Sequence, residues 1–259
     1  MTEQVVNKSE STRKLTLLKL LQEHKKLTNE QMSDLTFCSQ ATLRRGLIEL
    51  EKEGHIRRIR GGAVLEVAQN HEISADYRYH INAKMKEHIA EIASTFIGSG
   101  MSLFLDSSGT VSKIIPYLAT VSNLVIVTNG LKTAYDLIQI KTLDSKVFFF
   151  CGEAIYDAAS TVGNYGNEFL DAITIDLALF STTGLDEQGA YEANFEQMML
   201  KRRIINKAKA SILMVDSTKF GKLEPYKLAN LSSFESVITD NISEKQMADM
   251  QNMACELLY

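Results

Sequence analysis

Apolar residues near the start of the chain recur at the spacing of amphipathic helices. One stripe consists of Leu15, Leu18 and Leu21, and the charged residues of that segment lie outside it. A second stripe, at positions i, i+4 and i+7, consists of Leu43, Leu47 and Leu50. Because residues three and four apart share one face of a helix, each stripe predicts a helix that buries its leucines.

Polar residues mark where two of the early helices begin. Thr28, with Gln31 three positions later, has the pattern of a capping box and predicts a short helix over 29–35. Ser39 is the N-cap candidate of the next helix, over 40–53. Three helices with a tight turn between the second and the third predict a helix-turn-helix.

The segment after the third helix has the pattern of a β-hairpin. Residues 55–65 alternate between apolar and polar side chains and contain the pair Gly61-Gly62, which predicts the wing of a winged helix-turn-helix. Residues 66–83 are mixed and polar, so we expect a linker there. The following stretch, 84–97, predicts a helix.

Short apolar runs then alternate with helical stretches. The strand-like runs are Ser102–Asp106, Leu124–Thr128, Val147–Cys151, Leu177–Ser181, Ile212–Asp216 and Ser236–Thr239. The helical stretches between them include Val111–Leu118, Lys132–Ile140 and Phe195–Ala208. This alternation predicts an α/β, Rossmann-like fold with a mostly parallel sheet covered on both faces. The expected organisation is a winged helix-turn-helix domain over 1–65, a linker over 66–83 and an effector-binding α/β domain over 84–259.

Charge is distributed unevenly between these parts. Residues 1–65 hold 12 Lys and Arg against 8 Asp and Glu, a balance of +4. The remaining 16 basic and 24 acidic residues give the rest of the chain a balance of −8. A basic segment attached to an acidic body favours a nucleic-acid-binding head on a separate domain.

Two kinds of segment are missing from the sequence. No apolar run is long enough to span a bilayer, and the opening residues MTEQVVNKSESTRK lack the apolar core of a signal peptide. We therefore expect a cytoplasmic protein with no membrane partner. The histidines and cysteines show no metal-ligand spacing, so neither a metal nor another cofactor is expected.

The third helix and the wing carry the residues expected to contact DNA. Arginine binds guanine or phosphate, hydroxyl side chains suit either target, and a glycine pair lets backbone approach DNA closely. The candidates are Ser39, Gln40, Thr42, Arg44, Arg45, Arg57, Arg58, Arg60, Gly61 and Gly62. A solvated basic face is the alternative, which the helix-turn-helix spacing and the basic wing disfavour.

Polar residues follow the ends of several predicted strands. The first group, 106–110, reads D-S-S-G-T and lies between a strand and a helix, where backbone N–H groups and a helix N-terminus favour an anion. Further groups lie at 128–130, 151–153, 182–186 and 216–221. The carboxyl ends of parallel strands meet at one edge of a sheet, so these groups predict a ligand site. There Lys219 is expected to bind phosphate, and Asp106 or Asp186 to accept sugar hydroxyls.

Residues 39–63 read S-Q-A-T-L-R-R-x-L-x-x-L-E-x-x-G-H-I-R-R-x-R-G-G-A. This closely resembles the helix-turn-helix and wing signature of the DeoR family of bacterial regulators. Two positions depart from the family pattern, because Gly46 replaces an aspartate and Arg60 replaces a histidine. A glycine inside a helix costs about 1 kcal/mol relative to alanine, and the lost aspartate implies a different setting of Arg44 and Arg45. The resemblance implies DNA binding and leaves the operator preference open.

The second part of the chain also resembles this family, over a region extending to about residue 240. The family order of D-x-G-T-T, T-N, G-G, G-[IV]-D, E-x-x-x-K-R and D-x-[ST]-K-[FL]-G elements is followed, with Cys151, Ser108 and Gln197 as departures. Glu196 lies beside Gln197, which occupies the usual glutamate position. The effector residues that the resemblance implies are Asp106, Ser107, Ser108, Gly109, Thr110, Thr128, Asn129, Gly152, Asp186, Lys201 and Lys219.

The resemblance implies a sugar-phosphate isomerase fold, typified by ribose-5-phosphate isomerase, that binds sugar phosphates without transforming them. The expected protein is a repressor of a carbohydrate uptake or catabolism operon, relieved by a phosphorylated sugar and not an enzyme. Its expected partners are double-stranded operator DNA, that effector and further copies of itself in a dimer or tetramer. The alternatives are an activator, a sugar-phosphate isomerase-like enzyme with a DNA-binding head, and a constitutive DNA-binding protein whose large domain only oligomerises.

Overall fold

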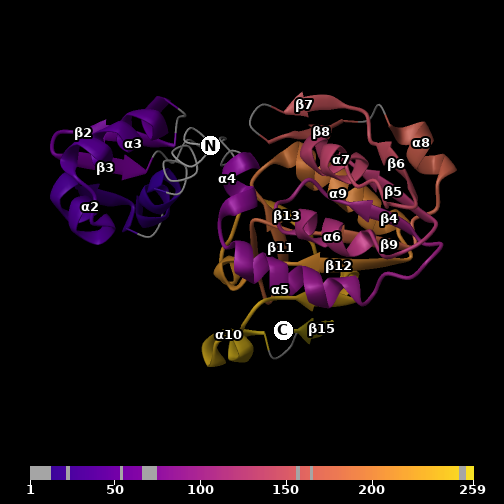
Figure 1. The fold of residues 1–259 in the computed structure, drawn as a ribbon. Helices are drawn as coiled ribbons and strands as arrows, with labels where there is room; N and C mark the ends of the chain where they lie inside the picture. Colours follow the sequence, from indigo (N-terminus) through magenta and orange to yellow (C-terminus); the bar gives the residue numbers. More distant parts are fainter. Residues whose placement is uncertain are drawn as a thin grey trace. The chain divides into compact units, whose positions relative to one another are not determined.

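The chain folds as two units, residues 1–73 and residues 74–259. The structure, a computed structural model (Figure 1), describes residues 13–21, 24–52, 55–65, 75–155, 158–163, 166–250 and 255–259. The boundary falls inside the segment expected to be a linker. The later part of that segment is helix α4, Ala75–His80, so the second unit begins earlier than the helix predicted from residue 84.

The N-terminal unit contains the helices that the capping and leucine patterns predict. Residues 13–21 are helical, and α2 and α3 span Asn29–Thr36 and Gln40–Lys52. Thr28 and Gln31 form the predicted capping box. Thr28 Oγ1 accepts the Gln31 backbone N–H at 3.1 Å, and Gln31 Oε1 accepts the Thr28 backbone N–H at 2.9 Å. All three leucines of the α3 stripe are buried.

The first helical stretch corrects one detail of its predicted stripe. Leu17 is buried with Leu18 and Leu21, whereas Leu15 is only partly buried. Leu17 lies one helical turn before Leu21, so it occupies the same face, and the stripe is shifted relative to the predicted one.

The wing is a hairpin with a third strand along one edge. Strands β2, Ile56–Ile59, and β3, Gly62–Leu65, pair antiparallel, and β1, Lys26–Thr28, pairs with the other edge of β3. Gly61 forms the turn with a φ of 81°. A Cβ at Gly62 would lie 2.3 Å from the Leu27 carbonyl oxygen. Gly62 is therefore buried by packing between strands, which corrects its expected place among exposed DNA-contacting residues.

The C-terminal unit is built on a seven-stranded sheet in the order β15-β14-β12-β9-β4-β5-β6, with every neighbouring pair parallel. Its strands are β4 Ser102–Leu105, β5 Leu124–Thr128, β6 Ser145–Phe149, β9 Leu177–Phe180, β12 Ala210–Met214, β14 Ser236–Ile238 and β15 Glu256–Leu258. Six of these correspond to predicted strands, and β6 begins and ends two residues earlier than predicted. The parallel α/β class predicted from the alternation is confirmed.

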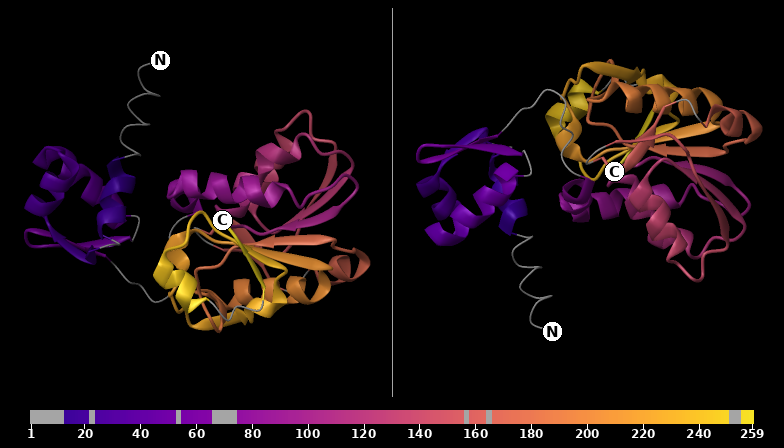
Figure 2. Two further views of the ribbon diagram at one scale, coloured as in Figure 1. Left: turned by 90° about the horizontal axis from the view of Figure 1, so that it is seen from below. Right: turned by 90° about the horizontal axis from the view of Figure 1, so that it is seen from above.

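Helices cover both faces of this sheet (Figure 2). The helices fall into two groups, and each group contributes residues to its own apolar cluster. The first group is α5 Ala83–Ser94, the 3₁₀ helix η1 Val111–Ile114, α6 Ile115–Leu118 and α7 Leu131–Ile138. The second group is α8 Asn167–Ala172 and α9 Phe195–Lys207. The five inner strands, β4, β5, β9, β12 and β14, are buried on both sides, which explains their continuous apolar runs.

Smaller elements surround the carboxyl edge of the sheet. A hairpin of β7, Glu153–Ile155, and β8, Ser160–Val162, follows β6. A three-stranded sheet has the order β10-β11-β13, with β10 at Gly184–Asp186, β11 at Gly189–Glu192 and β13 at Tyr226–Ala229. The remaining elements are η2 Ser217–Lys219, η3 Leu231–Ser233 and α10 Glu244–Asp249. Among the described residues, no helix has the length and apolar character that crossing a bilayer requires.

The packing role of Gly62 can be tested against its neighbour Gly61. Gly62→Ala forces a methyl group onto the backbone of β1, so we expect the N-terminal unit to lose about 3 kcal/mol or more of stability. Gly61→Ala meets no atom within 4 Å and strains only its left-handed backbone, at about 1 kcal/mol. Hydrogen exchange of the α3 amides in the full chain measures both. Equal effects of the two substitutions would contradict the packing role.

Candidate DNA interface and effector site

Helix α3 presents polar and basic side chains opposite its buried leucines. Ser39, Gln40, Arg44 and Arg45 are exposed, and Thr42 is partly buried. Ser39 Oγ accepts the backbone N–H of Thr42 at 3.3 Å and lies 2.9 Å from Thr42 Oγ1. The Ser39 hydroxyl therefore caps the start of the helix, while Gln40 and the arginines remain accessible.

The basic residues of the wing fall into two groups. Arg57 and Arg60 are exposed. Arg58 is attached to α3, because its backbone N–H donates to Glu51 Oε1 at 2.7 Å and its guanidinium lies 3.6 Å from Glu51 Oε2. An exposed ion pair contributes at most about 1 kcal/mol, so the main consequence of this pair is to orient the wing relative to α3.

Two further residues shape this surface. Gly46 lies inside a continuous α3, and a Cβ there would come within 2.9 Å of Leu17 Cδ1, so the glycine leaves room for the first helix. Phe37 follows α2 with a left-handed φ of 52° and is 95% exposed. Sequence reasoning missed Phe37, which adds an apolar group beside the first turn of α3.

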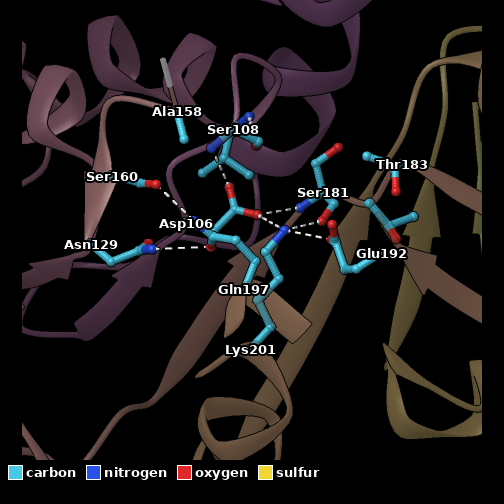
Figure 3. A network of polar contacts seen from close by, with 12 residues as sticks. Asp106, Ser108, Asn129, Ala158, Ser160, Ser181, Thr183, Glu192, Gln197 and Lys201 are labelled. Atoms are coloured by element: carbon cyan, nitrogen blue, oxygen red, sulfur yellow. Dashed lines mark hydrogen bonds and ion pairs between the residues drawn. The ribbon is translucent and has the colours of Figure 1, made fainter. Parts of the chain in front are cut away.

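In the C-terminal unit, a buried lysine lies at the carboxyl edge of the sheet (Figure 3). Lys201 Nζ lies 3.0 Å from Asp106 Oδ2 and 2.7 Å from Glu192 Oε1, and it donates to the Ser181 carbonyl oxygen at 2.7 Å. Burial by itself would lower the pKa of Lys201. The two carboxylates outweigh that effect and hold its pKa above the ordinary value, so the lysine is charged.

Asp106 connects this lysine to the predicted anion loop. Its Oδ1 accepts the Ser108 backbone N–H, and its Oδ2 accepts the Ser181 N–H, both at 2.8 Å. The side chain is fully buried. Asp106 thus fixes the start of the Ser107–Thr110 loop and the end of β9 at once, because one carboxylate accepts from both segments.

A second group of polar side chains lies next to the cluster. Gln197 Nε2 donates to Ser160 Oγ at 2.7 Å, and its Oε1 lies 3.4 Å from Asn129 Nδ2. Asn129 Oδ1 is buried and has no hydrogen-bond partner among the described residues, so it is available to a donor. Glu196 is exposed, and it therefore does not supply the carboxylate that the family pattern has at position 197.

Helix α4 lies directly on the anion loop. A Cβ at Gly109 would come within 2.5 Å of the Arg78 carbonyl oxygen and 3.0 Å of the Tyr79 backbone nitrogen. Lys86, from α5, donates to that same Arg78 carbonyl. The Arg78 guanidinium donates to the Ala158 carbonyl at 3.0 Å, so α4 also contacts the β7–β8 hairpin. Only glycine at 109 permits this approach of the α4 backbone.

Lys86 has an unusual electrostatic environment. Burial is the main cause that lowers its pKa to about 8, and nearby Lys219, Arg78 and Lys113 lower it further while Asp216 opposes them. The cations that surround Lys86 come from three elements, α4, η1 and η2. This concentration of positive charge beside the Ser107–Thr110 loop suits an anion.

The other predicted effector residues have different settings. Thr128 is buried and its Oγ1 accepts the Gly130 N–H at 3.0 Å. Asp186 Oδ1 accepts hydrogen bonds from the Gly189 backbone N–H and from Tyr191 Oη, the latter at 3.0 Å. Among the described residues, no hydrogen bond or ion pair joins Asp186 to Lys201, Asp106 or Glu192. Gly152 is a packing residue, since a Cβ would lie 2.1 Å from the Val162 carbonyl oxygen.

Several residues of the site were missed by sequence reasoning. They are Arg78, Lys86, Ser160, Ser181 and Glu192. Lys86 carried a usable signal, because it lies on the buried face of α5 with Ile89, Ala90 and Ala93. A lysine on an apolar stripe needs a polar partner. Glu192 had no such signal, since β11 was not predicted. In the described parts of the chain, no three His, Cys, Asp or Glu side chains gather where they could hold a metal ion.

Comparison with known protein families matches both units of the chain. Residues 13–69 match the DeoR-like helix-turn-helix domain, and residues 81–241 match the DeoR C terminal sensor domain. The chain belongs to the DeoR family of transcriptional regulators. It is thus a DNA-binding regulator of the helix-turn-helix type, as the motif at 39–63 predicted.

Curated members of the DeoR family align along most of the chain. The HTH-type transcriptional repressor GlcR of Bacillus subtilis is 29% identical, covering 92% of this chain and 91% of the relative. The lactose phosphotransferase system repressor of Staphylococcus epidermidis is 31% identical, covering 83% and 85%. The glycerol-3-phosphate regulon repressor of Escherichia coli is 28% identical, covering 86% and 88%. Among solved structures, a ribose-5-phosphate isomerase in complex with phospho-erythronic acid aligns at 18% identity and a TM-score of 0.40, covering 53% of this chain and 54% of the other.

The buried cluster of the sensor domain makes a sharp prediction about stability. Lys201→Met leaves Asp106 and Glu192 as adjacent buried carboxylates without their counter-ion, and we expect a loss of about 3–5 kcal/mol. Lys209→Met is the matched control, because it pairs with Asp176 at 2.7 Å from a side chain that is 67% exposed, and such a pair is worth about 1 kcal/mol. Urea unfolding of the two variants measures the difference, and similar losses would mean that the buried cluster is not a major source of stability.

Proposed function

We propose that this chain represses a carbohydrate uptake or catabolism operon and is released from its operator by a phosphorylated sugar. The DNA-binding part is supported above all by the accessible basic residues of α3 in a complete helix-turn-helix. The names of the relatives, repressors of lactose and glycerol 3-phosphate systems among them, support the metabolic assignment.

For the operator contacts we propose the first turns of α3 and the tip of the wing. Gln40, Thr42, Arg44 and Arg45 would meet base edges and phosphates in the major groove, as recognition helices do. Arg57 and Arg60 would contact the backbone or the minor groove. Ser39 contributes mainly by capping α3, Arg58 by orienting the wing, and Gly61 and Gly62 by the turn and its packing.

Substitution on α3 tests this interface. Arg45→Ala removes an accessible charge without touching the buried leucines, so we expect operator affinity to fall about ten-fold or more, the usual loss of about 1–3 kcal/mol for such a contact. Arg203→Ala, on α9 of the other unit, is the control and should leave affinity unchanged. The measurement is fluorescence anisotropy with DNA from upstream of the gene. Retained affinity in the Arg45 variant would remove α3 from the interface as proposed.

For the effector we propose that its phosphate binds the Ser107–Thr110 loop and Lys86. The loop offers hydroxyls and backbone N–H groups next to a concentration of cations, with Lys219 nearby. The sugar hydroxyls would face the polar side chains next to the loop, where Asn129 Oδ1 is an available acceptor. The ion pair of Asp106 and Lys201 would keep the pocket rigid. Thr128 would do the same by accepting the Gly130 N–H at the end of β5.

We propose that helix α4 couples effector binding to the DNA-binding unit. A phosphate at the loop would compete for Lys86 with the Arg78 carbonyl, which Lys86 now binds. Loss of that bond would weaken the hold on α4, the first element after the boundary between the units. Ligand binding and the position of α4 are then linked, so the effector shifts the population of DNA-binding arrangements.

We propose that the pocket binds its ligand without transforming it. An isomerase needs a carboxylate or lysine placed to move a proton, whereas Asp106 and Glu192 are both engaged by Lys201. The alternative, an isomerase-like enzyme, is tested by incubating the protein with ribose 5-phosphate and glucose 6-phosphate. Turnover of either one that is lost in Asp106→Asn would favour the enzyme.

The proposed role of Lys86 predicts a specific dependence on pH. The free protein holds the Lys86 pKa near 8, and an anion prefers the charged lysine. As pH rises above about 8, binding must therefore take up a proton, and affinity should fall by up to about ten-fold per pH unit. Calorimetric titration with glycerol 3-phosphate, glucose 6-phosphate and inorganic phosphate measures this effect.

Two variants make the pH experiment decisive. Lys86→Met should weaken binding of the phosphate compounds at neutral pH and remove the decline above pH 8. Lys113→Met, a more accessible lysine from the same surroundings that pairs with Glu87 at 3.2 Å, should keep the decline. If Lys86→Met bound as tightly as wild type, the phosphate would lie elsewhere, and the DNA-binding proposal would be unaffected.

A further inference from the structure

Three buried polar side chains next to the Ser107–Thr110 loop form a chain of hydrogen bonds: Asn129, Gln197 and Ser160 (Figure 3). Each of them is between 0% and 3% exposed. Asn129 follows β5 directly, Ser160 begins β8, and Gln197 lies in the first turn of α9. None of the three side chains carries a charge. They therefore connect three elements of the sensor unit through neutral groups alone.

A backbone carbonyl sets the direction of every hydrogen bond in this chain. The Thr161 carbonyl oxygen can only accept, so the Asn129 amide places its Nδ2 there, at 3.1 Å. The same Nδ2 lies 3.4 Å from Gln197 Oε1, which accepts from it. Gln197 Nε2 then faces Ser160 Oγ at 2.7 Å and donates to it. Reversing either amide would place two donors against each other, so the chain of bonds has one consistent direction.

This direction leaves one acceptor and one donor unused. Asn129 Oδ1 accepts no hydrogen bond from the described residues. Ser160 Oγ accepts from Gln197, and no hydrogen bond within the described parts of the chain uses the Ser160 hydroxyl hydrogen. Buried polar groups without partners are costly and rare in native proteins. The pair is therefore suited to a ligand group that donates to Asn129 and accepts from Ser160.

The pair lies beside the loop that is proposed to bind the effector phosphate. Gly130, the residue after Asn129, forms a β-bridge with Ser160. A Cβ at Gly130 would lie 3.0 Å from Ser107 Cα, so the backbone that connects the pair packs directly on the loop. One ligand of the size of a sugar phosphate can thus contact the loop and the pair together.

The carboxylates of the site are not placed to serve an amino group there. Asp106 and Glu192 are both paired with Lys201. Lys201 lies one helical turn after Gln197 and on the same face of α9, so a ligand ammonium would be a second cation beside it. A hydroxyl group donates and accepts at once, whereas an ammonium only donates, and its burial without a counter-ion is costly.

We propose that Asn129 Oδ1 and the Ser160 hydroxyl bind one hydroxyl group of the effector, and that Gln197 makes this subsite select a hydroxyl over an amino group. This selectivity rests on the proposed function, since it concerns the phosphorylated sugar that the sensor unit binds. It narrows that ligand to sugar phosphates that carry a hydroxyl group where amino sugar phosphates carry nitrogen. Gln197 is a positioning residue, because it sets the directions in which Asn129 and Ser160 form hydrogen bonds.

The substitution Gln197→Glu reverses the hydrogen bond to Ser160. A carboxylate accepts from both of its neighbours, so the Ser160 hydrogen turns toward residue 197 and the Ser160 oxygen becomes an acceptor for the ligand. The carboxylate also adds a negative charge that attracts an ammonium. Both changes favour an amino group, so the preference of the subsite should change and not only its affinity.

Calorimetric titration of the full chain at neutral pH measures this preference. The compounds are glucose 6-phosphate and its two analogues with an amino group on the second or the third carbon. The wild type should bind at least one analogue about ten-fold or more weakly than glucose 6-phosphate, because that analogue leaves a buried group unpaired. In Gln197→Glu this ratio should fall to about three-fold or less, or reverse. The control Met199→Glu adds the same charge on the exposed side of α9 and should keep the wild-type ratio.

The substitution Ser160→Ala is a second test that buries no new charge. It removes the donor hydrogen and leaves Asn129 in place, so the preference for glucose 6-phosphate should again shrink to about three-fold or less. A purely structural role of Gln197 would weaken all three compounds alike and keep the ratio. The wild-type ratio in either folded variant, or equal binding of all three compounds by the wild type, would overturn the selectivity and leave the sugar-phosphate proposal intact. Binding of none of the three would contradict both.

Discussion

The arrangement of the elements at the carboxyl edge of the sheet depends on the contacts of the Lys201 ammonium group. A lysine ammonium has three N–H donors, and here they face Asp106, Glu192 and the Ser181 carbonyl. Removing each ion from water costs several kcal/mol, which only close partners and complete hydrogen bonding can offset. Helix α9, strand β11 and the ends of β4 and β9 must therefore keep their relative positions, because any shift would leave one of these charges buried without its partner.

This constraint extends from the ion cluster to the anion loop. The Asp106 oxygen that Lys201 does not bind accepts the Ser108 N–H, so the loop starts from a fixed point. Gly109 then lets the backbone of α4 lie against the loop, and Lys86 holds α4 through the Arg78 carbonyl. The anion loop therefore lies between the buried Lys201 cluster and the short helix α4. In the proposed mechanism, a bound anion competes with the Arg78 carbonyl for Lys86 and thereby displaces the helix.

The sequence predicted the framework well and the contacts poorly, for physical reasons. The strands β4, β5, β9, β12 and β14 were predicted because burial on both faces produces continuous apolar runs that need no knowledge of their neighbours. The strands β10, β11 and β13 were missed because each has only three or four residues, too few for a clear alternating pattern. Glu192 lies on β11, so the second carboxylate of the cluster was missed with its strand.

Residues with a local chemical pattern were assigned more securely than residues whose role depends on tertiary contacts. The leucine stripe of α3 and the Thr28 capping box could be predicted because both are defined within one helical turn or two. Gly62 and Gly152 matched a motif, but each is required by a backbone oxygen that comes from another strand. A glycine in a motif therefore does not reveal whether a ligand or another strand approaches it, and only the fold distinguishes the two.

The distribution of charge within the sensor unit is what favours a ligand with two different ends. Asp106, Glu192 and Lys201 together carry a net charge of −1, which repels a phosphate and accepts hydroxyl donors. Around the Ser107–Thr110 loop, Lys86, Lys219, Arg78 and Lys113 outnumber Asp216 and attract a phosphate. Gln197 matters in this arrangement because it is neutral, and a glutamate there would add negative charge beside Asn129. The proposed effector, a small sugar with one phosphate, suits both ends, whereas a second phosphate would place charge against the carboxylates.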